Sequence, residues 1–276
     1  MIGLWITSLA LGFECAELSL PGGDRSTPSP GLPTGPVHAA LLDGGLGRAR
    51  RACPRTELAV APRALLLVDT PNFYGHVVAG LSLDGALALD PDTELFGRLE
   101  LIRYDSVISA VTSSTLTPGH TTVGATRVLR SEGLILALTG ELVLPTALGL
   151  YRGAWPLGLD VGLASQWADG PVEIHGQLTA LGSAALSRGP ALPRAGLAPV
   201  LGGSVRPLRG LALALDLQSM FLYTDDVDVV ALAPAVRLGL GDAWGAEIGS
   251  TLPLAGRERA LAVVDLRVAW RPGERP

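Results

Sequence analysis

Charged and polar side chains recur at every second position along many segments of this chain. Asp216 lies between Leu215 and Leu217, and a single apolar residue separates Asp265 from Arg267. Successive side chains of an extended strand point to opposite faces, so these polar groups collect on one face. The thirteen residues that this alternation assigns to such a face are the candidate functional residues: Asp84, Arg98, Glu100, Glu141, Asp160, Glu173, His175, Arg206, Asp216, Arg237, Glu247, Asp265 and Arg267.

These thirteen residues comprise eight carboxylates, four arginines and one histidine. If the opposite, apolar faces point to lipid, the polar faces enclose a mildly acidic lumen. Two interpretations stay open. The polar groups either bond to one another and stabilise a packed or water-filled interior, or they line a permeation path or a small binding cavity.

Catalysis has little support in the sequence. A nucleophile needs a base within hydrogen-bond reach. His120, His175 and Ser183 can be named as candidates, but His175 has no obvious serine partner at a matching height. We find no phosphate-binding loop, dinucleotide motif or metal-ligand cluster. The sequence therefore predicts a protein that is not an enzyme and holds no cofactor or metal, with an outer-membrane hydrolase as a remote alternative.

The elements that present these residues are predicted to be membrane-crossing strands. The 276 residues are 48% hydrophobic and 17% charged, with a mean hydropathy of +0.38, yet no apolar run reaches the 18 residues of a membrane helix. Apolar residues at every second position instead suit transmembrane strands of about 9 to 11 residues. We expect twelve: Thr56–Val68, Val77–Leu89, Leu95–Tyr104, Thr121–Leu129, Leu134–Leu144, Leu157–Trp167, Val172–Leu186, Ala195–Arg206, Leu211–Tyr223, Val229–Leu240, Ala246–Leu254 and Leu261–Trp270.

The connections between these strands fall into two length classes. Tight turns rich in Gly, Pro and Asp alternate with connections that are mostly longer, such as 105–119 and 145–155. Short periplasmic turns and long extracellular loops are typical of bacterial outer-membrane barrels. The predicted fold is therefore all-β: an antiparallel up-and-down barrel of about twelve strands, with both termini on the periplasmic side. The tight turns are Asp90–Thr93, Arg130–Gly133, Ala168–Pro171, Arg206–Gly210 and Gly241–Gly245.

Aromatic residues are expected to mark the two membrane interfaces. None lies in the middle of a predicted strand, whereas a soluble core would place Phe and Trp centrally. The predicted girdles comprise Phe96, Trp167, Trp244 and Trp270 at the short-turn ends, and Tyr74, Tyr104, Tyr151, Trp155 and Tyr223 at the long-loop ends.

Three residues do not fit this pattern. Pro199 and Pro234 lie inside predicted strands, where a missing N–H interrupts the ladder, so we expect bulges or shifted boundaries there. The run 121–129 lacks a clear apolar face, which leaves the side of Arg127 unassigned.

The N-terminal region differs from the rest of the chain. Residues 1–16 contain a short apolar run that predicts an export signal, with a misassigned start codon as the rival explanation, and 17–55 form a Pro/Gly-rich periplasmic linker. The barrel would span 56–270, followed by a tail at 271–276. Removal of the signal would leave Cys53 as a lone thiol; otherwise it can form a disulfide with Cys15.

Two stretches carry a family resemblance. Gly119–Leu129 (GHTTVGATRVL) and Gly140–Ala147 (GELVLPTA) resemble the outer-membrane transporter-like family associated with meta-pathway phenol degradation. Here His120 stands where that family has an acid, and Ala147 where it has a glycine. The resemblance implies an outer-membrane barrel and, loosely, passage of small or apolar molecules, and it carries over no catalytic residue.

The leading functional hypothesis is a narrow pore or transporter for small molecules in the outer membrane of a Gram-negative bacterium. The alternative is a structural or surface-interaction barrel with a plugged lumen. Expected partners are outer-membrane lipid, an unidentified small solute and the barrel-assembly machinery, through the C-terminal strand. The net charge of −5 gives no basic surface for nucleic acid.

Overall fold

The protein is an all-β structure. The computed structural model describes residues 52–69, 74–108, 113–130, 133–144, 146, 154–187, 194–208, 210–222, 227–240, 243–256 and 260–272. No helix within these ranges is long and apolar enough to cross a membrane. The strands are β1 (Glu57–Asp69), β2 (Tyr74–Asp90), β3 (Thr93–Ile108), β4 (Ser113–Thr117), β5 (Thr121–Arg130), β6 (Ile135–Leu144), β7 (Ala154–Asp169), β8 (Val172–Ser187), β9 (Arg194–Leu208), β10 (Leu211–Leu222), β11 (Val227–Gly239), β12 (Trp244–Gly256) and β13 (Ala260–Trp270).

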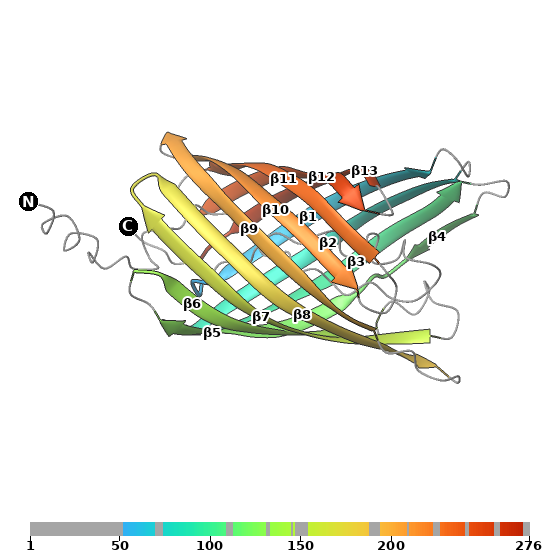
Figure 1. The fold of residues 1–276 in the computed structure, drawn as a ribbon, viewed down its shortest axis with the longest axis horizontal. Helices are drawn as coiled ribbons and strands as arrows, with labels where there is room; N and C mark the ends of the chain where they lie inside the picture. Colours follow the sequence, from blue (N-terminus) through green and yellow to red (C-terminus); the bar gives the residue numbers. More distant parts are fainter. Residues whose placement is uncertain are drawn as a thin grey trace, which may run out of the picture.

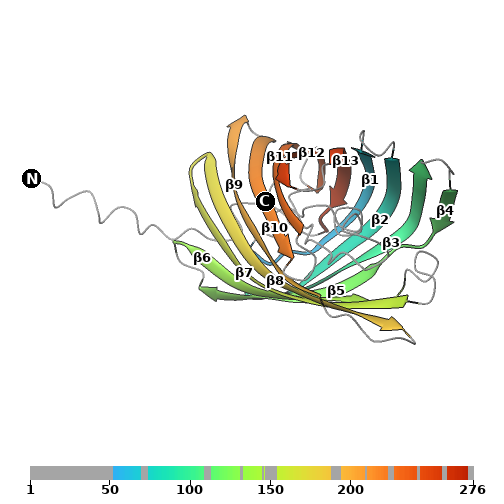
Figure 2. The same cartoon turned by 45° about the vertical axis from the view of Figure 1, so that its right-hand side comes forward.

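Twelve of these strands close into an antiparallel barrel (Figure 1). Strand β1 pairs with β2 on one side and with β13 on the other, which joins the two ends of the sheet. Each remaining barrel strand pairs with its neighbours in the sequence, except that β3 pairs with β5 along its first half and with the short β4 along its second half. Strand β4 thus extends the rim beside β3 (Figure 2).

The predicted fold class is confirmed, since every predicted strand coincides with a barrel strand. The sequence prediction treats residues 105–119 as one long connection and so does not include β4. The structure continues β3 to Ile108 and pairs Arg103–Val107 with β4. An extra residue at Leu101 shifts the β2–β3 register, so both Leu101 and Ile102 are exposed and the alternation restarts beyond them. Such a bulge hides the strand's continuation from a simple alternation test.

Large apolar side chains cover the outside of the barrel, and small or polar ones cover the inside. Leu215 is 52% exposed, whereas the adjacent Ala214 and Asp216 are buried. This is the reverse of a water-soluble barrel, and it is the distribution that a hydrocarbon environment stabilises.

The tight turns gather at one end of the barrel, on the left in Figure 1. Gly133, Gly170 and Gly210 adopt positive φ angles of 65°, 55° and 82° in three of these turns. Glycine populates this left-handed region without the steric cost of a Cβ, which explains its place in the turn sequences. The end that carries the tight turns is called the short-turn end below.

The prolines within strands are accommodated by gaps in the ladder. Pro234 lies in β11 and keeps its register with β10, but the β11–β12 pairing skips from Leu232 to Ala235. Likewise, Pro199 lies in β9 and the β9–β10 pairing skips from Leu197 to Val200. The register is the same on both sides of each gap. The expectation of a bulge or a shifted boundary at these prolines is therefore wrong. The missing N–H removes the pairing next to each proline, but the register of the strand does not change there.

Candidate functional site: the inner wall

All thirteen candidate residues lie on the inner face of the barrel. Nine are buried: Asp84, Glu141, Asp160, Glu173, His175, Asp216, Arg237, Glu247 and Arg267. The other four are half-buried: Arg98, Glu100, Arg206 and Asp265. Their low exposure indicates that much of this inner wall is covered by neighbouring side chains.

The inner wall also carries charged residues that the alternation did not assign. They add three carboxylates and four arginines among the residues that the structure describes: Glu57, Glu94, Asp105, Arg55, Arg63, Arg103 and Arg271. Eight carboxylates against four arginines become eleven against eight, so the acidic excess falls from four to three. Arg55 and Arg271 lie outside the strands, and Arg103 and Asp105 follow the Leu101 bulge; strand alternation could not place any of the four.

One part of the inner wall is a dense network of ion pairs. It comprises the inner faces of β13, β1, β2 and β3, and is called the paired wall below. The buried Glu57 accepts hydrogen bonds from Arg267 Nη2 (2.6 Å) and from Arg271 Nε (2.9 Å). Arg98 binds Asp84 through two bonds, of 2.8 Å from Nε and 3.2 Å from Nη2. Arg267 Nε also lies 3.6 Å from Asp84 Oδ2, which links the two clusters.

A small polar cavity of about 50 Å³ lies against the paired wall. Charged residues of both signs line it, which gives it no strong net charge. The charged lining residues are Arg63, Asp84, Arg98, Glu247, Asp265 and Arg267.

Two further charge pairs continue around the barrel. Arg237 Nε donates to Glu247 Oε2 (2.8 Å) between β11 and β12. His175 on β8 and Asp216 on β10 make a 2.9 Å contact between Nε2 and Oδ1 across β9. This contact passes over Gly202, where a Cβ would overlap Asp216, so glycine is required at that point of β9.

Glu173 is held from several directions. Gln166 Nε2 donates to its Oε1 (3.1 Å), His175 Nδ1 lies 3.6 Å from the same oxygen, and Arg206 Nη2 lies 3.7 Å from Oε2. His175 thus lies between two carboxylates, those of Glu173 and Asp216. This arrangement resembles a structural charge cluster more than a nucleophile with its base.

The carboxylates of β6 and β7 are arranged differently. Glu141 and Asp160 are direct partners in the β6–β7 register, and both side chains are buried. Neither carboxylate oxygen of Asp160 has a hydrogen-bond partner. The inner faces of β6 and β7 are together called the acidic wall below.

Residues 52–56 cross the lumen near the short-turn end. Ala52 is buried against the inner faces of β5, β6 and β7, and its N–H donates to Gln166 Oε1 (3.1 Å). The N–H of Arg55 donates to Glu94 Oε2 on β3 (2.8 Å). The chain then enters β1, which pairs with β2 and β13. This segment, called the strap below, therefore narrows the lumen. Cys53 within it is disulfide-bonded; the predicted export signal and its Cys15 lie outside the described residues.

The aromatic residues agree in part with two girdles. Trp244 and Trp270 are exposed on the outer face at the short-turn end, with ring centroids 6.4 Å apart. Trp167 and Tyr104 also point outward. Phe96 does not: it lies on the inner face opposite Gly124, where a Cβ would overlap its ring. Tyr151, Tyr223 and the side chains of Tyr74 and Trp155 lie outside the described residues.

Two other sequence candidates are now placed. Arg127, left unassigned above, points outward near the tight turn of β2 and β3 and pairs with Asp90 (3.5 Å) and Asp92 (3.9 Å). His120 is buried, and its backbone N–H donates to Glu100 Oε2 (3.0 Å). Within the described part of the chain, no group of three His, Cys, Asp or Glu side chains could hold a metal ion.

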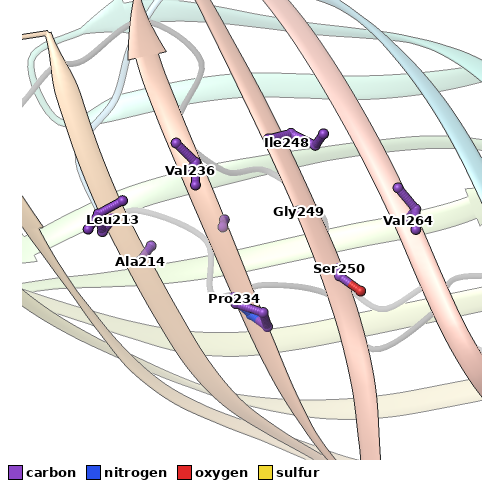
Figure 3. Close-up of a pocket in the computed structure, with 9 residues that line it drawn as sticks. Leu213, Ala214, Pro234, Val236, Ile248, Gly249, Ser250 and Val264 are labelled. Carbon is purple, nitrogen blue, oxygen red and sulfur yellow. The ribbon is translucent and has the colours of Figure 1, made fainter.

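An apolar groove of about 440 Å³ lies on the outer wall, at the ladder gap beside Pro234 (Figure 3). Strands β10 to β13 form it, and its outward side chains are apolar except for Ser250. Because it opens on the lipid-facing side, it belongs to the membrane surface of the barrel. The other outward lining residues are Leu213, Val236, Ile248 and Val264.

The sequence matches no known family model and no curated protein. The structure is similar to that of an outer membrane channel from Pseudomonas putida F1, with a TM-score of 0.61 and 15% identity over 80% of this chain and 97% of that chain. It is also similar to the beta domain of the Bordetella autotransporter BrkA, with a TM-score of 0.51 and 15% identity over 78% of this chain and 98% of that one. This chain therefore has the closed barrel fold of Gram-negative outer-membrane proteins.

Proposed function

We propose that this protein is a narrow pore or transporter for small solutes in the outer membrane. The observation that carries the proposal is a closed barrel with an apolar exterior and an inner wall of eleven carboxylates and eight arginines among its described residues. A polar inner wall behind an apolar outer wall is typical of outer-membrane barrels whose lumen holds water. The likeness to a channel supports the same function.

The strap supports a pore that is narrow. It crosses the short-turn end and is held by Gln166 and Glu94. We expect Gln166→Ala to raise the single-channel conductance, because it removes the bond that fixes Ala52 to the wall. Ser165→Ala, on the outer side of the same strand, is the matched control.

The test is conductance. Purified protein reconstituted in a planar bilayer should give small single-channel steps, after heat-modifiable migration on gels has shown that the barrel is closed. Absence of conductance from heat-modifiable protein, for both the native chain and Gln166→Ala, would contradict the proposal. That result would favour the second candidate, a plugged barrel that acts through its outer loops. The burial of the inner charged side chains is the observation that supports this candidate.

We also propose the finer relationship to the family associated with meta-pathway phenol degradation. Its two motif stretches lie side by side: β5 pairs with β6, the N–H of Thr121 donates to Thr146 Oγ1 (2.8 Å), and that hydroxyl donates to the Gly119 carbonyl (3.1 Å). A shared local structure of this kind would explain why both stretches resemble the family. Uptake of small phenols into liposomes tests the substrate that the resemblance implies.

We propose that outer-membrane lipid surrounds the barrel, that the barrel-assembly machinery reads the β13 strand ending at Trp270, and that the protein has no catalytic activity. Crosslinking from Trp270 during assembly in cells would test whether the barrel-assembly machinery contacts β13.

A further inference from the structure

Strands β1 and β13 meet along the seam that closes the barrel (Figure 2). Backbone pairing along this seam runs from Leu58 to Val60, skips Ala61 and Pro62, and resumes at Arg63. Proline has no N–H to donate, so it weakens a ladder at the place where it lies. Strand β13 keeps its pairing with β12 at the same height, and the interruption therefore belongs to the seam.

Charged side chains cross the seam beside this interruption. Arg267 lies on β13 at the level of the interruption, and its Nη2 donates to Glu57 Oε1 on β1 (2.6 Å). Arg271, one residue beyond the end of β13, donates from Nε to Glu57 Oε2 (2.9 Å). All three side chains are buried. Because hydrogen bonds between an arginine and a carboxylate are shorter and stronger than neutral ones, one carboxylate ties the last strand of the barrel to the first.

The strap and the second strand join the same cluster. Arg55 Nε lies 3.6 Å from Glu57 Oε2, and Arg267 Nε lies 3.6 Å from Asp84 Oδ2 on β2. Glu57 therefore lies where the strap, the first strand and the last strand meet. Its bond to Arg267 exists only while the seam is closed, because the two residues are 210 positions apart in the chain.

Another buried ion pair of the inner wall differs in this one respect. Arg237 Nε donates to Glu247 Oε2 (2.8 Å), and both side chains are as well buried as those at the seam. The two residues are ten positions apart on the consecutive strands β11 and β12. This pair closes only a short loop of chain and needs no closed seam. Comparing the two pairs therefore separates the effect of a buried ion pair from the effect of its position.

We propose that Glu57, together with Arg267 and Arg271, is a lock that holds the closing seam shut and fixes its register. A slip of β1 by one residue would turn its side chains to the opposite face. A slip by two would move Glu57 about 7 Å along the seam, out of reach of both arginines. The lock compensates for the pairing lost at Pro62, where an open seam would expose unpaired strand edges. The inference concerns the barrel itself and does not depend on the proposed transport function.

Native-state hydrogen exchange of the full chain in detergent micelles tests the lock. Glu57→Gln keeps the shape of the side chain and removes its charge. It should speed the exchange of the paired amides of β1 and β13 by about tenfold or more, as the loss of bonds to a charged group implies. Amides of β6 and β7, on the other side of the barrel, should change much less. Glu247→Gln is the matched control and should leave exchange at the seam unchanged.

Three results would overturn the lock: native exchange rates in β1 and β13 of Glu57→Gln, equal acceleration in all strands, or the same acceleration at the seam in Glu247→Gln. The last two would leave Glu57 only the general stabilising role of a buried ion pair. If Glu57→Gln does not give heat-modifiable protein, Arg271→Gln and Glu57→Asp take its place, and each should speed exchange at the seam. Failure of all three to close, while Glu247→Gln closes, would itself support the lock; failure of Glu247→Gln as well would reject it.

Discussion

The paired wall and the acidic wall both contain buried carboxylates, but they differ in the contacts that these carboxylates make. On the paired wall both Glu57 and Asp84 are buried. Glu57 contacts three arginines, Arg55, Arg267 and Arg271, and Asp84 contacts two, Arg98 and Arg267. On the acidic wall, Asp160 is equally buried, lies beside Glu141 and has no hydrogen-bond partner. The comparison shows that the charged contacts are distributed unevenly over the inner wall. The overall acidic excess is small, and short hydrogen bonds between arginine and carboxylate lie on the paired wall, whereas Asp160 accepts no hydrogen bond.

The largest expected effect breaks the paired wall. Glu57→Ala removes the carboxylate that binds Arg267 and Arg271 and leaves buried guanidinium groups without it, which should cost about 3–5 kcal/mol of unfolding free energy. Urea unfolding in lipid vesicles measures it. The double variant with Arg267→Gln should recover part of the loss; a loss that is simply additive would mean that the pair contributes nothing.

The next effect tests which face of each strand points to lipid and which points to the lumen. Both the paired wall and the acidic wall depend on this assignment. Leu215 points outward and is 52% exposed, so Leu215→Arg should cost about 2–4 kcal/mol if that face meets hydrocarbon. Leu215→Ile is the control. Asp216→Asn is less mild than alternation alone suggests, because Asp216 contacts His175 at 2.9 Å; loss of a bond to a charged group costs about 1.5–3 kcal/mol. Equal stability of Leu215→Arg and Leu215→Ile in bilayers would contradict the orientation.

A matched pair of substitutions compares the walls directly. Asp84→Asn should destabilise by about 1–3 kcal/mol, since it weakens two bonds from Arg98. Asp160→Asn, also buried, should be neutral or stabilising, because it removes a buried carboxyl group whose oxygens accept no hydrogen bond. Unfolding of both variants in the same vesicles measures the difference. Destabilisation of the same size in both would erase the distinction between the walls.

The smallest effect concerns ion selectivity. Asp160→Asn should lower the preference for K⁺ over Cl⁻ in a salt gradient, whereas Glu173→Gln should change it less, because Arg206 and Gln166 already engage Glu173. Reversal potentials measure both, and the difference should fade as salt screens the lumen. A larger change with Glu173→Gln would move the selective region to β8.

The sequence by itself determined the side of the barrel on which most residues lie. Alternation has a period of two and needs only local chain geometry, so Asp84, Asp160 and Asp265 could all be assigned inward without a structure. It failed where local geometry departs from that period, as at the Leu101 bulge before Arg103, and it said nothing of Arg55 and Arg271, which lie outside strands. The assignment of Phe96 to the outer girdle was also wrong, because it used the distance from the tight turn; alternation itself places Phe96 on the same face as Arg98 and Glu100, and the ring covers Gly124 inside.

Only the tertiary structure decided which charges meet. Glu57 and Arg267 lie 210 positions apart and meet because β1 closes the barrel against β13. Asp160 faces Glu141 instead of an arginine because of the β6–β7 register. The strap likewise reaches the inner faces of β5 to β7 only once the barrel exists. Partners across strands depend on register and closure, and these are properties of the whole sheet that no local pattern encodes.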